Sequence, residues 1–94
     1  MVRGITDNLE EKLDEFLEKN AIIMQDGFIK CEYLIEKLNY SIEYETLTIV
    51  DKEGTNYLKI NLNQIYNIEK NDKEIKFYLD NDLTISIKIK KIDL

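Results

Sequence analysis

The sequence predicts an α+β fold in which an N-terminal amphipathic helix packs on an antiparallel, largely meandering sheet of about five to seven strands. Three observations predict it: a helical apolar stripe within residues 7–20, period-two alternation through most of residues 21–92, and connections too short for parallel crossovers. Both apolar sets are buried if the helix covers one face of the sheet. The chain has 94 residues and is expected to form a single domain, 1–94.

Residues 7–20, DNLEEKLDEFLEKN, have the pattern of a helix. Asp7 is a suitable N-cap residue, and Glu10 three residues later has the spacing of a capping box. Lys19 and Asn20 are residue types that favour a C-terminal end. The apolar residues recur at i, i+4, i+7 and i+8 and so share one face: Leu9, Leu13, Phe16 and Leu17.

The next segment, NAIIMQDGFIKCEY, places Asp26 and Gly27 between two apolar runs. This dipeptide is a strong signal for a type I′ hairpin turn, which requires a positive φ at both central residues. We expect strands at about 21–25 and 28–35. A helix over residues 28–39 stays open as an alternative, because these residues also form a helical stripe: Phe28, Cys31, Ile35 and Leu38.

From Ser41 onward the pattern is that of strands. The segments IEYETLTIV, NYLKINL, EIKFYLD and LTISIKIKKI are rich in β-forming residues and alternate with period two, and turn residues separate them. The segment NQIYNIEK is compatible with a strand or with a turn. In the last two strands one face is predicted to be buried through these residues: Ile75, Phe77, Leu79, Ile85, Ile87 and Ile89.

The composition argues against an enzyme. The chain contains no histidine, which is the commonest general base and transition-metal ligand in proteins. Its single cysteine, Cys31, alternates with apolar residues, and we expect it to be a buried core residue. The segment Asp80–Asp82 lacks the Gly and Glu that complete a calcium loop, and is expected to be a turn. We therefore predict no catalytic residue, no metal site and no cofactor.

The charge predicts the kind of partner. A net charge of −6 repels phosphate backbones, so we expect no direct binding of nucleic acid and favour another protein with a basic surface as the partner. Lys88, Lys90 and Lys91 form a small basic end, interpreted as edge-strand lysines that discourage aggregation. Neither a membrane-spanning run nor a signal peptide is found, which predicts a cytoplasmic protein without membrane contact.

The candidate binding residues are carboxylates and tyrosines. On the predicted helix, an acidic strip lies opposite the apolar stripe: Glu11, Asp14, Glu15 and Glu18. Over seven helical residues these carboxylates span about 10 Å, with an axial spacing of about 3 Å, close to the spacing of phosphates along one DNA strand. An ordinary solvated helix face is the alternative. Aromatic anchors of an interface are expected among these tyrosines: Tyr40, Tyr44, Tyr57 and Tyr78.

One stretch, LKINLNQIYNIEKNDKEIKFYLDNDLTISIKI, resembles the strand pattern of pleckstrin-homology-like bacterial domains. It covers about a third of the chain and contains no specific motif. The family places its helix after the sheet, whereas here the predicted helix comes first. The resemblance therefore implies a binding domain and assigns no site residue.

These observations lead to a non-enzymatic protein-binding module. In its most specific form it is a phage-type inhibitor, acting in the manner of anti-CRISPR proteins, whose acidic face blocks a basic nucleic-acid-binding surface. The abundance of Ile, Asn, Lys and Glu, with few Gly and no Pro, is similar to that of AT-rich bacterial or phage genes. The alternatives are an assembly protein that forms homo-oligomers through its sheet edges and a pleckstrin-homology-like binding domain.

Overall fold

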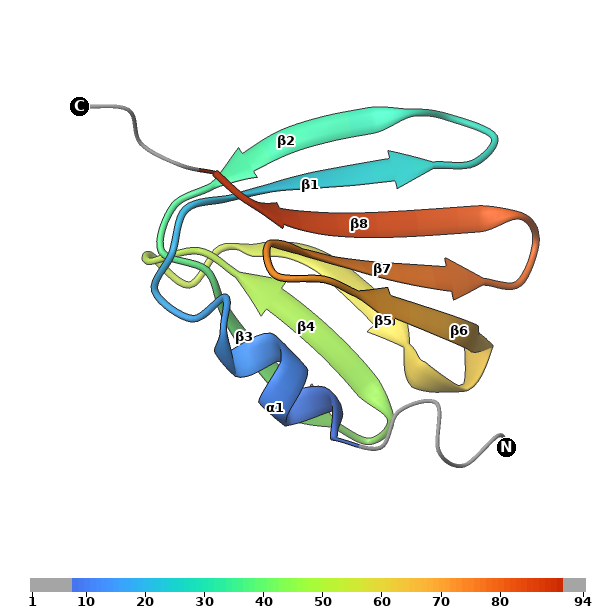
Figure 1. Cartoon of the computed structure of the whole chain (residues 1–94), viewed down its shortest axis with the longest axis horizontal. Helices are drawn as coiled ribbons and strands as arrows, with labels where there is room; N and C mark the ends of the chain where they lie inside the picture. Colours follow the sequence, from blue (N-terminus) through green and yellow to red (C-terminus); the bar gives the residue numbers. More distant parts are fainter. Residues whose placement is uncertain (1–7, 91–94) are drawn as a thin grey trace.

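The computed structural model describes residues 8–90, except the side chains of residues 56 and 57. One short helix precedes eight strands, and a 3-10 turn separates the fifth strand from the sixth (Figure 1). The elements are α1 (Leu9–Asp14), β1 (Ala21–Asp26), β2 (Cys31–Ile35), β3 (Asn39–Glu43), β4 (Thr46–Val50), β5 (Asn56–Asn61), η1 (Leu62–Gln64), β6 (Ile65–Lys70), β7 (Glu74–Leu79) and β8 (Leu83–Ile89). The α+β class with antiparallel strands is confirmed.

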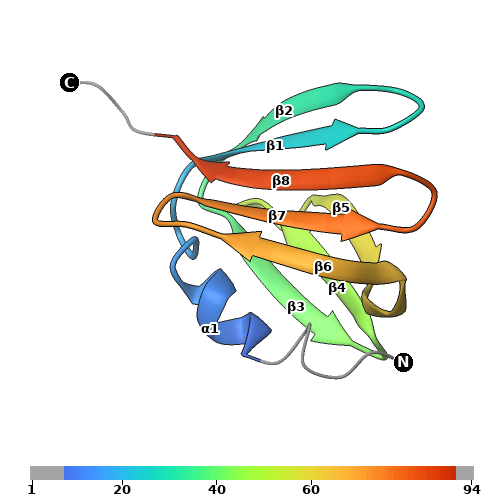
Figure 2. The same cartoon turned by 45° about the vertical axis from the view of Figure 1, so that its right-hand side comes forward.

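The strands form two sheets, and the prediction of one sheet with five to seven strands is wrong. The larger sheet has the order β2-β1-β8-β7-β6, and the smaller one has the order β3-β4-β5. Each sheet has one face of buried apolar residues, and packing these two faces together removes both from water. Figure 2 shows the small sheet lying across the large one, with α1 beside β3 at one open side.

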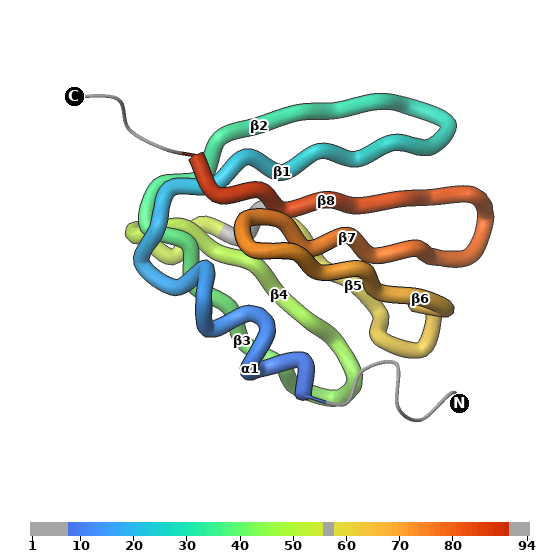
Figure 3. Tube along the Cα trace, viewed as in Figure 1, coloured from blue at the N-terminus to red at the C-terminus, as the bar shows by residue number. Residues whose placement is uncertain are grey.

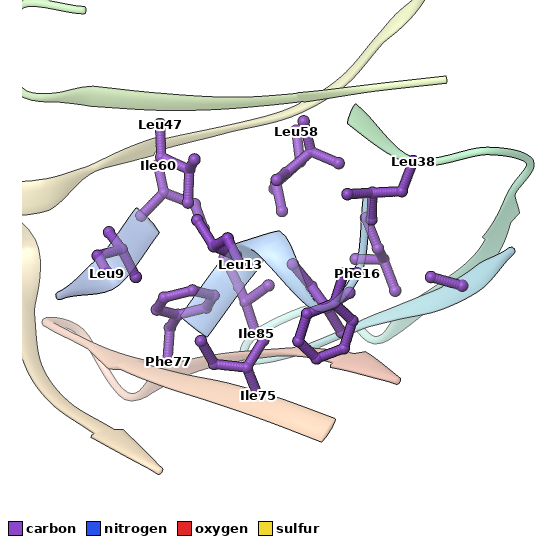
Figure 4. Packing of buried hydrophobic residues seen from close by; sticks show 14 of the residues in the cluster. Leu9, Leu13, Phe16, Leu38, Leu47, Leu58, Ile60, Ile75, Phe77 and Ile85 are labelled. Atoms are coloured by element: carbon purple, nitrogen blue, oxygen red, sulfur yellow. The ribbon is translucent and has the colours of Figure 1, made fainter. Parts of the chain in front are cut away.

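The core lies between the two sheets. Figure 4 shows Leu47 and Ile60 of the small sheet facing Phe77 of the large sheet, with Leu13 of α1 among them. The prediction that the apolar side of the helix is buried is confirmed for Leu9 and Leu13, and also for Phe16 just after the helix. Each such side chain contributes about 1.5–3 kcal/mol through burial.

The predicted helix over residues 7–20 is too long, since α1 covers only Leu9–Asp14. Beyond α1 the backbone turns toward the segment before β3: Glu18 has φ 63 and donates its N–H to the carbonyl of Leu38 at 2.8 Å. The N–H of Leu38 in turn donates to the carbonyl of Lys19 at 2.9 Å. These long-range bonds replace the next helical turn. The predicted N-cap, Asp7, lies outside the described residues.

The hairpin of β1 and β2 is confirmed, but its turn is not of type I′. Gln25 pairs with Cys31, so a longer loop separates the strands, and φ is not positive at Asp26 or at Gly27. A Cβ at Gly27 would lie 3.0 Å from Cδ1 of Leu83, so close packing explains this glycine. The alternative helix over 28–39 does not form, because β2 occupies residues 31–35 in the middle of that range.

The segment IEYETLTIV, predicted as one strand, is divided between β3 and β4 (Figure 3). Glu43 pairs with Thr46, and the two residues between them, Tyr44 and Glu45, have φ of 49 and 62. Positive φ at both central residues is the type I′ geometry. No residue type in the segment signals this turn, because Gly and Asn usually occupy such positions and are absent here.

The C-terminal strands agree best with the prediction. Ile75, Phe77 and Leu79 of β7 are buried, as are Ile85 and Ile87 of β8, while Ile89 is half-buried. The ambiguous segment NQIYNIEK contains the end of η1 followed by β6. β8 lies between β1 and β7, so the interpretation of Lys88 as a guard of a sheet edge is wrong; Lys90 follows β8, and Lys91 lies outside the described residues.

Candidate partner-binding surface

Three carboxylates of α1 point away from the core. Leu9 and Leu13 are buried, and the helical geometry then turns Glu10, Glu11 and Asp14 outward, where all three are exposed. Among the described residues, none of these carboxylates has a lysine or arginine nitrogen within ion-pair distance. This side of the molecule therefore carries uncompensated negative charge.

The regular acidic strip predicted from the sequence does not form. Glu15 stands at the C-cap of α1, and Glu18 lies beyond the helix at positive φ, so the four carboxylates do not share one helical strip. An oxygen of Glu15 also lies 3.0 Å from Nζ of Lys70, an ion pair that joins the end of α1 to β6. The periodic match to a phosphate backbone is therefore lost, and Glu11 and Asp14 are the members of the strip that remain on α1.

Tyr40 of β3 is brought to α1 by the fold. Its hydroxyl donates a hydrogen bond to Oδ1 of Asp14 at 2.7 Å and lies 3.3 Å from the backbone carbonyl oxygen of Glu10. Burial raises the pKa of Tyr40 to about 12, and the hydrogen bond to Asp14 and the nearby negative charges act in the same direction. Two of the predicted site residues, Asp14 and Tyr40, thus lie together although 26 positions separate them. We call Glu10, Glu11, Asp14 and Tyr40 the α1 surface.

Tyr44 lies in the turn that follows β3, four positions after Tyr40. A strand rises about 3.3 Å per residue, so Tyr44 is within about 13 Å of Tyr40 along the chain. Its side chain is 95% exposed, and its backbone adopts a positive φ of 49. The neighbouring Glu45 accepts a hydrogen bond from Nδ2 of Asn63 at 2.5 Å, and its carbonyl accepts one from Leu62 at 2.8 Å. These two contacts hold the turn against the end of β5.

The other predicted tyrosines do not join the α1 surface. Tyr78 alternates with the buried Phe77 and therefore points to the outer face of the large sheet. There it is hydrogen-bonded to Glu69 and its ring centroid lies 6.2 Å from that of Tyr66. The hydrogen bond to Glu69 raises the pKa of Tyr78. Tyr57 belongs to β5, but its side chain lies outside the described part of the chain.

Cysteine and carboxylate side chains are the groups with metal-binding chemistry in the described chain. Cys31, predicted to be buried, is exposed at the start of β2, whereas Ile35 at the end of the same strand is buried. Residues 8–90 hold no group of three His, Cys, Asp or Glu side chains arranged for a metal ion. A hollow of about 340 Å³ between β6 and β7 is lined by two carboxylates, two lysines and one asparagine, with no tyrosine. Neither α1 nor η1 has the length and apolar composition to cross a membrane.

Comparison of the chain with protein-family models, with curated proteins and with solved structures found no match. The likeness of residues 58–89 to pleckstrin-homology-like domains therefore stays a resemblance. Sequence reasoning missed the role of Lys70, whose Nζ pairs with Glu15 and lies 5.6 Å from the ring centroid of Phe16. No local pattern signals such a contact, since it depends on how β6 meets the end of α1.

Proposed function

We propose that this protein is a non-enzymatic protein-binding module whose α1 surface binds a basic surface of another protein. The observation that carries the proposal is the set of exposed, unneutralised carboxylates at Glu10, Glu11 and Asp14, with Asp14 held in place by the hydroxyl of Tyr40. A positioned carboxylate loses less side-chain freedom on binding than a free one. Complementary charge then favours rapid association with a cationic partner.

In its more specific form the proposal is a phage-type inhibitor of the anti-CRISPR kind. The partner is then a protein whose cationic groove holds nucleic acid, and the α1 surface occupies part of that groove. The net charge of −6 supports this choice, since it steers the protein toward such a groove and away from nucleic acid itself. Local charge is sufficient for binding of this kind, and regular phosphate-like spacing is not required.

Tyr44 is the proposed aromatic anchor of the same interface. A non-glycine residue in the left-handed region costs about 1–2 kcal/mol, and a fully solvated tyrosine ring adds little to stability in return. Strained residues of this kind concentrate at functional sites. The turn that carries Tyr44 follows β3, whose Tyr40 contacts α1, so one partner can contact both α1 and the turn.

Charge reversal with a matched control tests the α1 surface. The variant Glu10→Lys with Glu11→Lys changes the net charge by +4, from −6 to −2, and so does Glu53→Lys with Asp72→Lys, whose residues are also exposed. Proteins captured from a host lysate by the wild type are identified by mass spectrometry and titrated with each variant. We expect the α1 variant to bind about tenfold or more weakly, or about 1.4 kcal/mol, and the control to bind within about threefold.

Equal binding by the two charge variants would contradict the proposal, since total charge alone would then explain the affinity.

The variant Tyr44→Asn tests the aromatic anchor separately from the stability of the fold. It relieves the strained turn, because asparagine tolerates positive φ, so we expect a more stable protein that binds its partner less well. Circular dichroism and urea unfolding check that every variant is folded.

A further inference from the structure

β2 is an open edge of the large sheet. Among the described residues only β1 pairs with it, so one side of the β2 backbone faces outward. In both cartoons β2 lies at the rim of the molecule, on the side opposite α1 (Figures 1 and 2). An edge of this kind presents N–H and C=O groups to which another strand can add.

Two of the other edge strands, β6 and β3, have features that discourage pairing. β6 has a register shift between Ile65 and Asn67 and carries Glu69 and Lys70 at its end. β3 lies beside α1 and contacts it through Tyr40. β2 has fewer such features: its sequence CEYLI contains one charged residue, Glu32, and no Lys, Arg or Pro, and it pairs with β1 in an unbroken register.

Exposed apolar side chains concentrate at the same place. Six large hydrophobic residues of the described chain are exposed, and four of them belong to the hairpin of β1 and β2: Met24, Phe28, Ile29 and Leu34. Only Tyr44 and Tyr66 lie elsewhere. Clustered exposed apolar groups mark surfaces that become covered by a partner. An open strand edge with apolar side chains beside it is suited to another strand of similar character.

We propose that this edge pairs with β2 of a second copy of the chain, antiparallel and about a two-fold axis at Tyr33. The two large sheets then form one continuous sheet across the dimer. Tyr33 lies opposite the partner's Tyr33, and Cys31 lies opposite the partner's Ile35. On the other face, Glu32 lies opposite the partner's Leu34.

Charge selects this register among the symmetric ones. Centring the axis on Glu32 would place two Glu32 carboxylates opposite each other, and centring it on Leu34 would place Glu32 opposite the partner's Glu36. Like charges in such positions destabilise strand pairing. The axis at Tyr33 avoids both pairs, overlaps all of β2 with its copy, and sets Lys30 opposite the partner's Glu36. Within one copy Lys30 lies 4.0 Å from Asp26 and Glu36 lies 2.8 Å from Lys52, so the pairs at the two ends of the dimer form in exchange for these contacts or beside them.

Charge at position 34 tests the register. Leu34 is 46% exposed, so its replacement leaves the core intact. Leu34→Glu brings two carboxylates together, at position 34 and at Glu32 of the partner subunit, whereas Leu34→Lys creates an opposite-charge pair there. In sedimentation equilibrium, we expect the average mass of the wild type to rise with concentration from 11.2 kDa toward twice that value. The Lys variant should do the same, and the Glu variant should stay a monomer at every concentration.

Disulfide trapping gives an independent readout. In the double variant Cys31→Ser, Tyr33→Cys the two new thiols face each other about 5 Å apart between Cα atoms, within reach of a disulfide. In the wild type the two Cys31 residues are offset by four positions, about 13 Å, which is too far. Mild oxidation should therefore cross-link the double variant and leave the wild type monomeric on non-reducing gels.

Three results would overturn the proposal. A wild type that stays monomeric at millimolar concentration would leave no dimer to explain. Equal loss of association by Leu34→Glu and Leu34→Lys would indicate apolar contact without strand register. Cross-linking through native Cys31 would place the axis elsewhere on β2. None of these outcomes bears on the α1 surface, which lies on the opposite side of the molecule.

Discussion

The two hairpins of the large sheet differ in what lies against them. In the hairpin of β7 and β8, alternate apolar residues such as Phe77 and Ile87 are fully buried between the two sheets. In the hairpin of β1 and β2, the equally apolar tip is open, with Phe28 fully exposed and Cys31 uncovered. Alternation in a sequence thus marks which residues share a face, but it does not tell which part of that face is covered: on β2 itself Ile35 is fully buried and Cys31 is exposed.

Truncating one phenylalanine in each hairpin is the strongest test of this difference. Phe77 is 0% exposed, so Phe77→Ala removes a large buried ring and leaves a cavity, and should lower the free energy of unfolding by about 3–5 kcal/mol. Phe28→Ala removes the same number of atoms from solvent and should change it by less than about 0.5 kcal/mol. Urea unfolding followed by circular dichroism measures both.

Two outcomes would alter the comparison. A loss of more than about 1 kcal/mol in Phe28→Ala at low protein concentration would mean that the hairpin tip is covered within the monomer. If the loss appears only at high concentration, the tip is covered by a second copy of the chain. The loss expected for Phe77→Ala is close to the whole stability of a small domain, so Ile87→Val, with an expected loss of about 0.5–1.5 kcal/mol, serves as the milder variant.

The sequence was a good guide in the middle of the large sheet and a poor one at the tip of the hairpin of β1 and β2 and at the end of α1. Ile75 and Phe77 were correctly expected to be buried, since β7 lies between β6 and β8 and its inner face is covered. Cys31 has the same alternating neighbours but lies on an edge strand. The helix was overextended for a related reason: the N–H of Glu18 donates to the carbonyl of Leu38, a long-range contact that local periodicity does not encode.

The candidate site was predicted by residue type but not by geometry. Exposed carboxylates on α1 follow directly from amphipathic spacing, which is why Glu11 and Asp14 were identified. The contact of Tyr40 with Asp14 arises from the fold, because β3 lies beside α1 only after the small sheet has packed. The turn at Tyr44 could not be predicted, since its backbone conformation opposes the intrinsic preference of the residue.

Gly27 offers a finer test, since it is where the two hairpins touch. The Cβ of Gly27→Ala would lie 3.0 Å from Cδ1 of Leu83, at the start of β8, and one of the two must move. Because the end of a leucine side chain can shift, we expect a loss of only about 1 kcal/mol in the free energy of unfolding. In a Leu83→Ala background Cδ1 of Leu83 is absent, so Gly27→Ala should change the free energy of unfolding by close to zero.

A double-mutant cycle reads this contact directly. An interaction free energy near ~1 kcal/mol between Gly27→Ala and Leu83→Ala would confirm that the hairpins press on each other through this pair. Additive losses would mean that alanine at position 27 is strained for a reason unrelated to Leu83. Gly54→Ala is the contrasting control: a Cβ there would have no atom within 4 Å, but its φ of 82 disfavours alanine, so its cost should not depend on Leu83.

The smallest effects on stability are expected from two tyrosine hydroxyls. One is hydrogen-bonded within the large sheet, and the other is hydrogen-bonded between β3 and α1. Tyr78 of β7 bonds to Glu69 of β6, whereas Tyr40 of β3 bonds to Asp14 of α1, and both pKa values are raised, that of Tyr40 to about 12. A raised pKa means that the fold favours the neutral hydroxyl. The stabilisation is therefore complete below the ordinary tyrosine pKa near 10 and is lost as the pH rises through the folded value.

Absorbance titration of tyrosine ionisation between about pH 9 and 13 should resolve these groups. Tyr40→Phe should remove the step near pH 12, and Tyr78→Phe should remove a different late step. The stability of Tyr40→Phe should fall less between about pH 10 and 12 than that of the wild type, because its contact with α1 no longer titrates. An unchanged slope would mean that the hydroxyl of Tyr40 does not hold β3 to the helix, and that Asp14 is as free on the α1 surface as its neighbours.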